Sequence, residues 1–174
     1  MKRFIGITIL MILFIMEGQS LKAQKFKFGH ISSDELILEM PEFDSARIKL
    51  DRFRKELINH LELMSSELNN KNEAYNKESK NLSDVVRNVK EQEMMDMNRR
   101  IQEFQDMAQT QLQEKQLEFF QPVYAKVEKA IQDVGKENDY LYIFNSSQGG
   151  SLIYFDKAIS TDVTDMVKVK LKLR

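Results

Sequence analysis

The sequence of 174 residues contains no cysteine. Disulfide bonds and thiolate metal sites are therefore excluded, and so is a lipid-modified N-terminal cysteine. Only two prolines and six glycines occur, and none of them lies between Phe43 and Gln121. Because proline and glycine most often interrupt helices, their absence over residues 43–121 predicts a long helical region.

A marked excess of charge of either sign is also missing. The chain has 26 basic and 27 acidic residues, so its formal net charge is −1, and removal of residues 1–23 would change it to about −3. Charges of both signs are interspersed along the helical region, as is typical of a solvated helical surface. This pattern argues against nucleic acid as a partner.

Long apolar runs are limited to the N-terminus. Lys2 and Arg3 precede the apolar run 4–16, which has thirteen residues, and the small residue Ala23 follows it. This pattern predicts a secretory signal peptide over residues 1–23, cleaved after Ala23. The alternative is an N-terminal membrane anchor, but thirteen residues are fewer than the roughly twenty that span a bilayer.

Apolar residues recur three and four positions apart through residues 43–121. They are Phe43, Ala46, Leu50, Phe53, Leu57, Leu61, Met64, Leu68, Tyr75 and Leu82, and then Met94, Met97, Ile101, Phe104, Ala108, Leu112 and Phe119. This is a heptad seam that drifts as a straight helix does. The polar stretch 79–84 predicts a reversal with Ser83 as a helix N-cap. We therefore expect an antiparallel coiled-coil hairpin of arms 43–79 and 85–121, and one uninterrupted helix is the alternative.

Residues 24–42 and 122–174 are expected to form a small body, into which residues 43–121, the arm, are inserted. We expect a strand over 25–31 that buries Phe26, Phe28 and His30, followed by a short helix that begins at 32–35. Pro41 is expected to end this helix and to lie in the first turn of the next one. After Pro122 we expect a helix that finishes over 135–139, strands over 140–144 and 152–155 joined as a hairpin by a turn at 146–151, a loop over 157–161 and a last helix that starts at 162–165. The predicted fold class is α+β, mostly α, with a small β-sheet body of three short strands.

A body of this size seldom stabilises itself. One core in so small a domain contributes no more than about 3–5 kcal/mol, and neither a disulfide nor a metal cluster is available to this one. Three short strands also leave sheet edges that need pairing. The sequence therefore predicts a homo-oligomer assembled through the strands. The candidate oligomerisation residues are Phe26, Phe28, Ile31, Tyr142, Phe144, Leu152 and Tyr154.

Several stretches resemble the Skp/OmpH family of periplasmic chaperones. They are KFKFGHISSDE at 25–35, MPE at 40–42, RIQEFQ at 100–105, YLYIFN at 140–145 and DVT at 162–164, and they occur in the family's order. The resemblance covers the whole mature chain. It implies a homotrimer with a small β-barrel body and three helical tentacles around a cavity. It also implies an ATP-independent holdase that keeps unfolded outer-membrane proteins from aggregating in the periplasm.

A holder of unfolded chains needs many weak apolar contacts rather than one specific pocket. The candidate client-binding residues are Ile48, Ile58 and Met95, which lie off the seam, and Tyr75, Leu82, Val85, Val86, Val89 and Met94, which lie near the reversal. Two alternatives remain open. The off-seam residues could contact a neighbouring subunit or be scattered surface residues, and those near the reversal could form a local cluster that closes the turn.

No enzymatic activity, metal site or cofactor is predicted. His30 and His60 lie far apart in the expected architecture, the acidic residues are dispersed, and Gly149-Gly150 lies in a turn between strands rather than in a phosphate-binding loop. No basic cluster supports contact with lipopolysaccharide or a membrane. The rival function is that of an envelope coiled-coil structural or adaptor protein that binds one folded partner.

Overall fold

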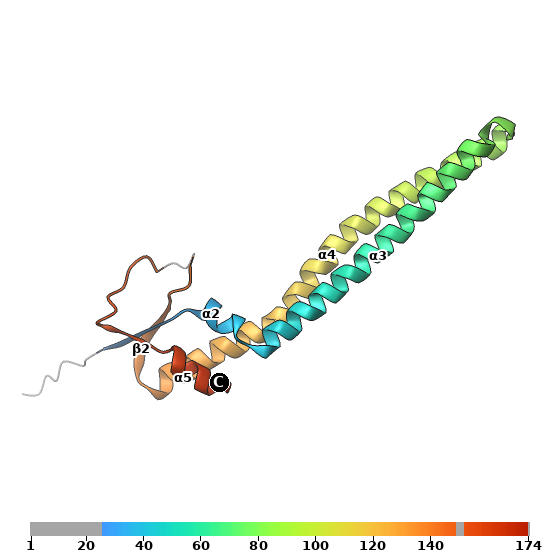
Figure 1. Ribbon diagram of the computed structural model, residues 1–174. Coiled ribbons are helices and arrows are strands. Elements are labelled where there is room, and N and C mark those ends of the chain that lie inside the picture. Colours follow the sequence, from blue (N-terminus) through green and yellow to red (C-terminus); the bar gives the residue numbers. More distant parts are fainter. Residues whose placement is uncertain (1–25, 149–151, 174) are drawn as a thin grey trace, which may run out of the picture.

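The computed structural model describes residues 26–148 and 152–173, so the expected signal peptide and part of the expected turn at 146–151 lie outside the described residues. The elements are β1 (Lys27–Ile31), α2 (Ser33–Leu38), α3 (Pro41–Glu78), the 3-10 turn η2 (Ser79–Asn81), α4 (Asp84–Glu137), β2 (Tyr140–Asn145), β3 (Ser160–Asp162) and α5 (Thr164–Leu171). The fold is mostly helical with one small three-stranded sheet, as predicted. Figure 1 shows α3 and most of α4 projecting as a long rod from a cluster of strands and short helices.

The long helices begin at local capping signals. Pro41 is the first residue of α3, a position where the missing N–H of proline costs nothing. After η2, the Ser83 hydroxyl accepts a hydrogen bond from the Val86 amide and so caps α4. The chain reverses at η2, between these two helices (Figure 1).

Contacts between α3 and α4 join residues in opposite order along the chain. The rings of Phe43 and Phe120 lie 5.1 Å apart at the base of the arm, and those of His60 and Phe104 lie 4.8 Å apart near its middle. At the tip, the Tyr75 hydroxyl donates a hydrogen bond to the Glu91 carboxylate. The two helices therefore lie side by side along the length of the arm.

The C-terminal part of α4 belongs to the body. Pro122 lies inside α4 and removes one backbone donor, yet the helix continues to Glu137. The expectation that the helix finishes over residues 135–139 is confirmed, because α4 ends at Glu137 and Asp139 adopts a left-handed backbone with φ of 58°. Packing sustains the helix past Pro122, since Val123 is 4% exposed and Val134 is 2% exposed.

The sheet differs from the predicted hairpin. Its order is β2-β1-β3, and both outer strands pair with β1 in parallel. The expected strand over 152–155 is not paired, and the third strand is Ser160–Asp162, where a loop was expected. Parallel strands need a long connection, and the arm with its helices supplies one between β1 and β2. β3 therefore lies on the opposite side of β1 from β2.

The buried face of β1 is also the opposite of the expected one. Gly29 and Ile31 face the core, whereas Phe26 is exposed and Phe28 and His30 are half-buried. A Cβ on Gly29 would lie 3.0 Å from Val163 Cγ1, so glycine allows α5 to begin close to the strand. The close packing of β1 against the start of α5 therefore decides which face of the strand is buried, and the aromatic side chains lie on the other face.

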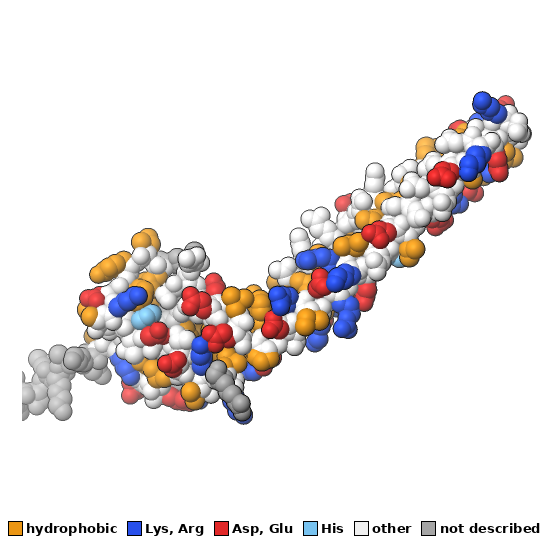
Figure 2. All heavy atoms as spheres, viewed as in Figure 1, with side chains coloured by type: hydrophobic (Ala, Val, Ile, Leu, Met, Phe, Trp, Pro, Cys, Tyr) orange, Lys and Arg blue, Asp and Glu red, His pale blue; other side chains and the backbone are white. Residues whose placement is uncertain are grey.

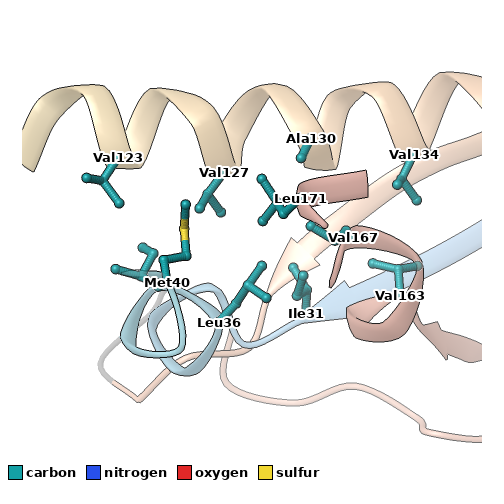
Figure 3. Packing of buried hydrophobic residues seen from close by; sticks show 11 residues of the cluster. Ile31, Leu36, Met40, Val123, Val127, Ala130, Val134, Val163, Val167 and Leu171 are labelled. Atoms are coloured by element: carbon teal, nitrogen blue, oxygen red, sulfur yellow. The ribbon is translucent and has the colours of Figure 1, made fainter. Parts of the chain in front are cut away.

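The core joins α4 to every other part of the body. In Figure 3, side chains from one face of α4 point towards α2, β1 and α5. The buried cluster consists of Ile31, Leu36, Ile37, Met40, Val123, Val127, Ala130, Val134, Val163, Val167 and Leu171. The expected apolar stripe after Pro122 is confirmed, as is the short helix that carries Leu36 and Ile37. Met40 was expected on this helix as well, but it lies after the helix ends and directly precedes α3, where it is fully buried.

Polar side chains tether the short helix α2 to the end of β2. Asn145 Oδ1 accepts hydrogen bonds from the Ser33 and Ser147 amides and from the Ser147 hydroxyl. The Ser147 hydroxyl oxygen in turn accepts a hydrogen bond from the Asp34 amide at 3.1 Å. Two of the free amides at the start of α2 are thereby satisfied from a distant part of the chain.

Candidate functional site

The seam between α3 and α4 is only partly covered. Ala46 and Leu50 near the base and Met97 further out are buried. The remaining seam residues are half-buried, and they include Phe53, Leu57, Leu61, Met64, Leu68, Ile101, Phe104, Ala108 and Leu112. Two helices alone leave part of such a seam open to solvent. Figure 2 shows hydrophobic side chains along the arm, among charged and uncharged polar ones.

The residues predicted to bind clients divide into a group that is exposed to solvent and a group that is half-buried. Those that are exposed are Ile48, Ile58, Val85, Val86, Val89 and Met95, and those that are half-buried are Tyr75, Leu82 and Met94. Val85 is the most exposed of them, at 73%. An exposed set of this kind is available for contact with another molecule.

An apolar groove, here called the tip groove, lies close to the reversal. Val85, Val86, Val89 and Met94 line it together with Ala74, and it has a volume of about 360 Å³. Two ion pairs lie beside it: Lys71 with Glu93 at 3.6 Å, and Lys90 with Glu78 at 3.1 Å. Four of the predicted residues thus come together in one recess with a charged rim.

A second groove, the mid-arm groove, lies between the two helices near the centre of the arm. Its floor and walls are Leu57, Ile58, Leu61, Phe104, Ala108 and Leu112, and its volume is about 240 Å³. Arg54, Gln105 and Gln109 complete its rim. Of the predicted client-binding residues, Ile58 lies here, whereas Ile48 and Met95 line neither groove.

The outer face of the sheet is aromatic. The rings of Phe28 and Tyr142 stack 6.4 Å apart, and those of Tyr142 and Phe144 lie 5.8 Å apart. Tyr142 is 57% exposed and Phe144 39% exposed. Here an aromatic surface faces solvent on the side of the sheet away from the core.

The other predicted oligomerisation residues are distributed differently. Phe26 and Tyr154 are exposed, and Leu152 is half-buried. Ile31 is only 1% exposed and packs within the core of its own chain. It therefore contributes to the body's own stability and offers no surface to a second copy.

Comparison with known families gives one match. The model of the family described as Outer membrane protein (OmpH-like) matches residues 27–171, from the first residue of β1 to the last residue of α5. The chain belongs to the OmpH-like family. The resemblance inferred from the sequence is thereby confirmed for both the body and the arm. A search of curated proteins gave no match.

Hydrogen bonds to carboxylates join α3 to α4 of the OmpH-like chain at both ends of the arm. Lys126 donates to Glu42 across the base of the arm, and this hydrogen bond lowers the pKa of Glu42. At the tip, the hydrogen bond to Glu91 raises the pKa of Tyr75, because loss of the hydroxyl proton would place two negative charges together. Both ends of the arm are thus fixed by polar contacts between α3 and α4.

Within the described residues, the OmpH-like chain shows no cluster of histidine and acidic side chains that could hold a metal ion. His30 forms a hydrogen bond between its Nδ1 and Ser160 Oγ, and His60 packs against Phe104, so the two histidines belong to different parts of the molecule. None of the helices in the described segments is both long and apolar enough to cross a membrane.

Several exposed apolar residues of the OmpH-like chain were not predicted as contact sites. They are Leu63, Met107 and Leu117 on the arm, Tyr124 at its base and Ile153 and Ile159 between β2 and β3. The arm residues depart from the seam spacing, so a complete list of off-seam apolar positions would have included them. Ile153 was missed because its apolar neighbours indicated a paired strand.

Proposed function

We propose that this OmpH-like protein is an ATP-independent holdase. It binds unfolded outer-membrane β-barrel proteins in the periplasm, after removal of residues 1–23, and prevents their aggregation. The observation that carries this proposal is the distribution of apolar surface along a two-helix arm, with open grooves at the tip and in the middle. Membership of the OmpH-like family supports it.

The form of this surface fits a client without fixed structure. Each partly exposed aliphatic side chain gains only a fraction of the roughly 1.5–3 kcal/mol that full burial provides. Several such contacts together retain a chain, and the loss of any one of them costs little. Release therefore needs no nucleotide, because the client leaves as soon as its own folding or a competing receptor offers more burial.

The proposed holdase is a homotrimer whose bodies meet through the sheet. Phe28, Tyr142 and Phe144 form the aromatic outer face, and β2 and β3 each have one edge without a partner strand in the described chain. Association of copies would cover this face and satisfy the exposed edges. Three arms that project from such a core would enclose a cavity for the client.

The test uses several unrelated outer-membrane proteins denatured in urea. Each is diluted into buffer with or without the mature protein, and aggregation is followed by light scattering. A holdase suppresses aggregation of all of them without ATP. Failure to suppress any of them, combined with one-to-one binding of a single folded protein, would instead identify an adaptor.

A further inference from the structure

The mid-arm groove contains an apolar row with a small residue at its centre. Phe104, Ala108 and Leu112 follow one another at intervals of four residues along α4, so they lie on one face of the helix. The small residue stands between two large ones. Leu57 and Leu61 of α3 line the opposite wall. A side chain from outside can therefore enter above Ala108, between Phe104 and Leu112.

The mid-arm groove is large enough for one large apolar side chain. The volume of the whole groove is about 240 Å³, and an apolar cavity of roughly 150 Å³ is known to accept a benzene ring. The ring of His60 packs 4.8 Å from that of Phe104 and supports the wall at this end. The site thus has room for one aromatic or branched aliphatic side chain.

The rim of this groove favours an uncharged, extended chain. Gln105 and Gln109 line it from α4, and their amides can both donate to and accept from a peptide backbone. Two positions four apart on a helix are separated by about 6 Å along its axis. Alternate residues of an extended strand repeat at roughly 6.6 Å, so both amides can reach successive backbone groups on one side of the same strand.

The tip groove is less suited to such a segment. Lys71, Lys90 and Glu93 lie on its rim, and an uncharged backbone would have to compete there with ion pairs. At the mid-arm groove, Arg54 is the only charged residue among those that line the recess. The two grooves therefore differ in the chemistry that they select.

We propose that the mid-arm groove is a docking site for one extended client segment whose apolar and polar residues alternate. One apolar side chain of the segment enters the recess above Ala108, and Gln105 and Gln109 bind its backbone. Alternation of this kind is the pattern of a transmembrane β-strand before it folds. The inference rests on the proposed holdase function and specifies which part of a client this site selects.

The experiment measures binding of a fluorescein-labelled peptide, in which Phe and Val alternate with Ser and Thr, to the full mature protein by fluorescence anisotropy. A second peptide of the same composition has its apolar residues in one block. Ala108→Leu fills the recess, and Ala125→Leu is the matched control because Ala125 is an exposed residue of the same helix. Gln105→Ala with Gln109→Ala removes the amides without a loss of helix propensity, and Gln113→Ala with Gln116→Ala is its control.

We expect the wild type to prefer the alternating peptide. Ala108→Leu should weaken that binding roughly tenfold, the effect of excluding one buried apolar side chain. The Gln105/Gln109 double variant should weaken it several-fold, and both controls should bind as the wild type does. The double variant, which alters exposed positions only, keeps the test decisive if Ala108→Leu disturbs the helix packing.

Equal binding of the two peptides by the wild type would overturn the proposal. So would unchanged binding by both groove variants. Suppression of client aggregation by the wild type is measured in parallel and judges the holdase function separately. A wild type that suppresses aggregation while its groove variants bind the alternating peptide normally would refute the groove and leave the holdase function standing.

Discussion

The hydroxyl of Tyr75 donates a hydrogen bond to the carboxylate of Glu91 across the tip of the arm. The two residues are sixteen positions apart in the sequence, and η2 lies between them. This contact joins α3 to α4 where few apolar side chains are buried. It explains how a thin arm stays closed at the end furthest from the body.

Tyr75→Phe removes this hydrogen bond and keeps the ring. We expect backbone amides around residues 72–92 to exchange with deuterium faster than in the wild type, because the tip opens more often. Hydrogen exchange followed by mass spectrometry measures this effect. Tyr124→Phe, at the base of the arm, should leave exchange at the tip unchanged, and equal exchange in both variants would contradict the role given to Tyr75.

The Asn145 side chain anchors α2 to the sheet, so its removal should destabilise the body. Asn145→Ala leaves the Ser33 and Ser147 amides without their acceptor, and we expect a loss of about 1 kcal/mol in the free energy of unfolding, because water can reach part of this site. Asn145→Asp should retain most of the stability, because a carboxylate accepts the same bonds near the start of a helix. Urea denaturation of both variants tests this, and equal losses in both would show that hydrogen-bond acceptance is not the reason.

Pro122 lies where α4 passes from the arm into the body. Pro122→Ala restores a backbone donor to the helix interior, and we expect the free energy of unfolding to rise by about 1–3 kcal/mol. Pro41→Ala is the matched control, since proline at the first position of α3 costs nothing there. Thermal unfolding of the two variants should therefore diverge, and a fall in stability for Pro122→Ala would contradict this account.

The carboxylate of Asp162 stabilises the start of α5, and this contribution should depend on pH. The Thr164 hydroxyl and amide donate to Asp162, and these hydrogen bonds lower its pKa in the folded protein. The unfolded pKa is about 3.9. The stabilisation is therefore present above that pH and is lost as the pH falls through the lower pKa of the folded state.

Asp162→Ala should reduce the free energy of unfolding by about 1 kcal/mol at neutral pH. The difference from the wild type should begin to shrink below about pH 4, where the carboxyl of the unfolded chain takes up its proton, and it should vanish once the pH lies below the lower pKa of the folded protein. Urea denaturation at several pH values measures both effects. A difference that stayed constant down to pH 2 would exclude the charge of Asp162 as the cause.

Local patterns in the sequence predict the helices and their ends. The seam spacing, Pro41 and Ser83 act within a few residues of themselves, and each has its expected place in the structure. The expected placement of Val85, Val86, Val89 and Met94 near the reversal follows from the same reasoning, and these four line one groove. Features that depend on residues close together in the sequence could thus be predicted from it.

The sheet could not be predicted in the same way, because distant residues determine it. Phe28 pairs with Ser160, which belongs to a short polar stretch without a strand pattern. The apolar run at 152–155 resembles a strand, but Ile153 is 99% exposed. The choice between these segments depends on their fit beside β1, which neither segment encodes alone.

The mid-arm groove also could not be predicted from the sequence, because residues of two helices form it together. Leu57 and Leu61 were assigned to the seam, and so were Phe104 and Ala108. Their spacing does not reveal that Ala108 leaves a recess between larger residues, because the recess exists only when α3 lies opposite α4. Gln105 and Gln109 carry no periodic signal and become relevant only through their position on its rim.

The central claim is that assembly through the sheet creates a holder for unfolded outer-membrane proteins. Its most direct test measures sedimentation of the mature protein and light scattering of a urea-denatured β-barrel protein diluted into it, for the wild type and for Tyr142→Ser with Phe144→Ser. We predict that the wild type sediments as a trimer and suppresses aggregation, whereas the double variant sediments as a smaller species and suppresses it poorly. A folded wild-type monomer, or full suppression by a monomeric double variant, would contradict the claim.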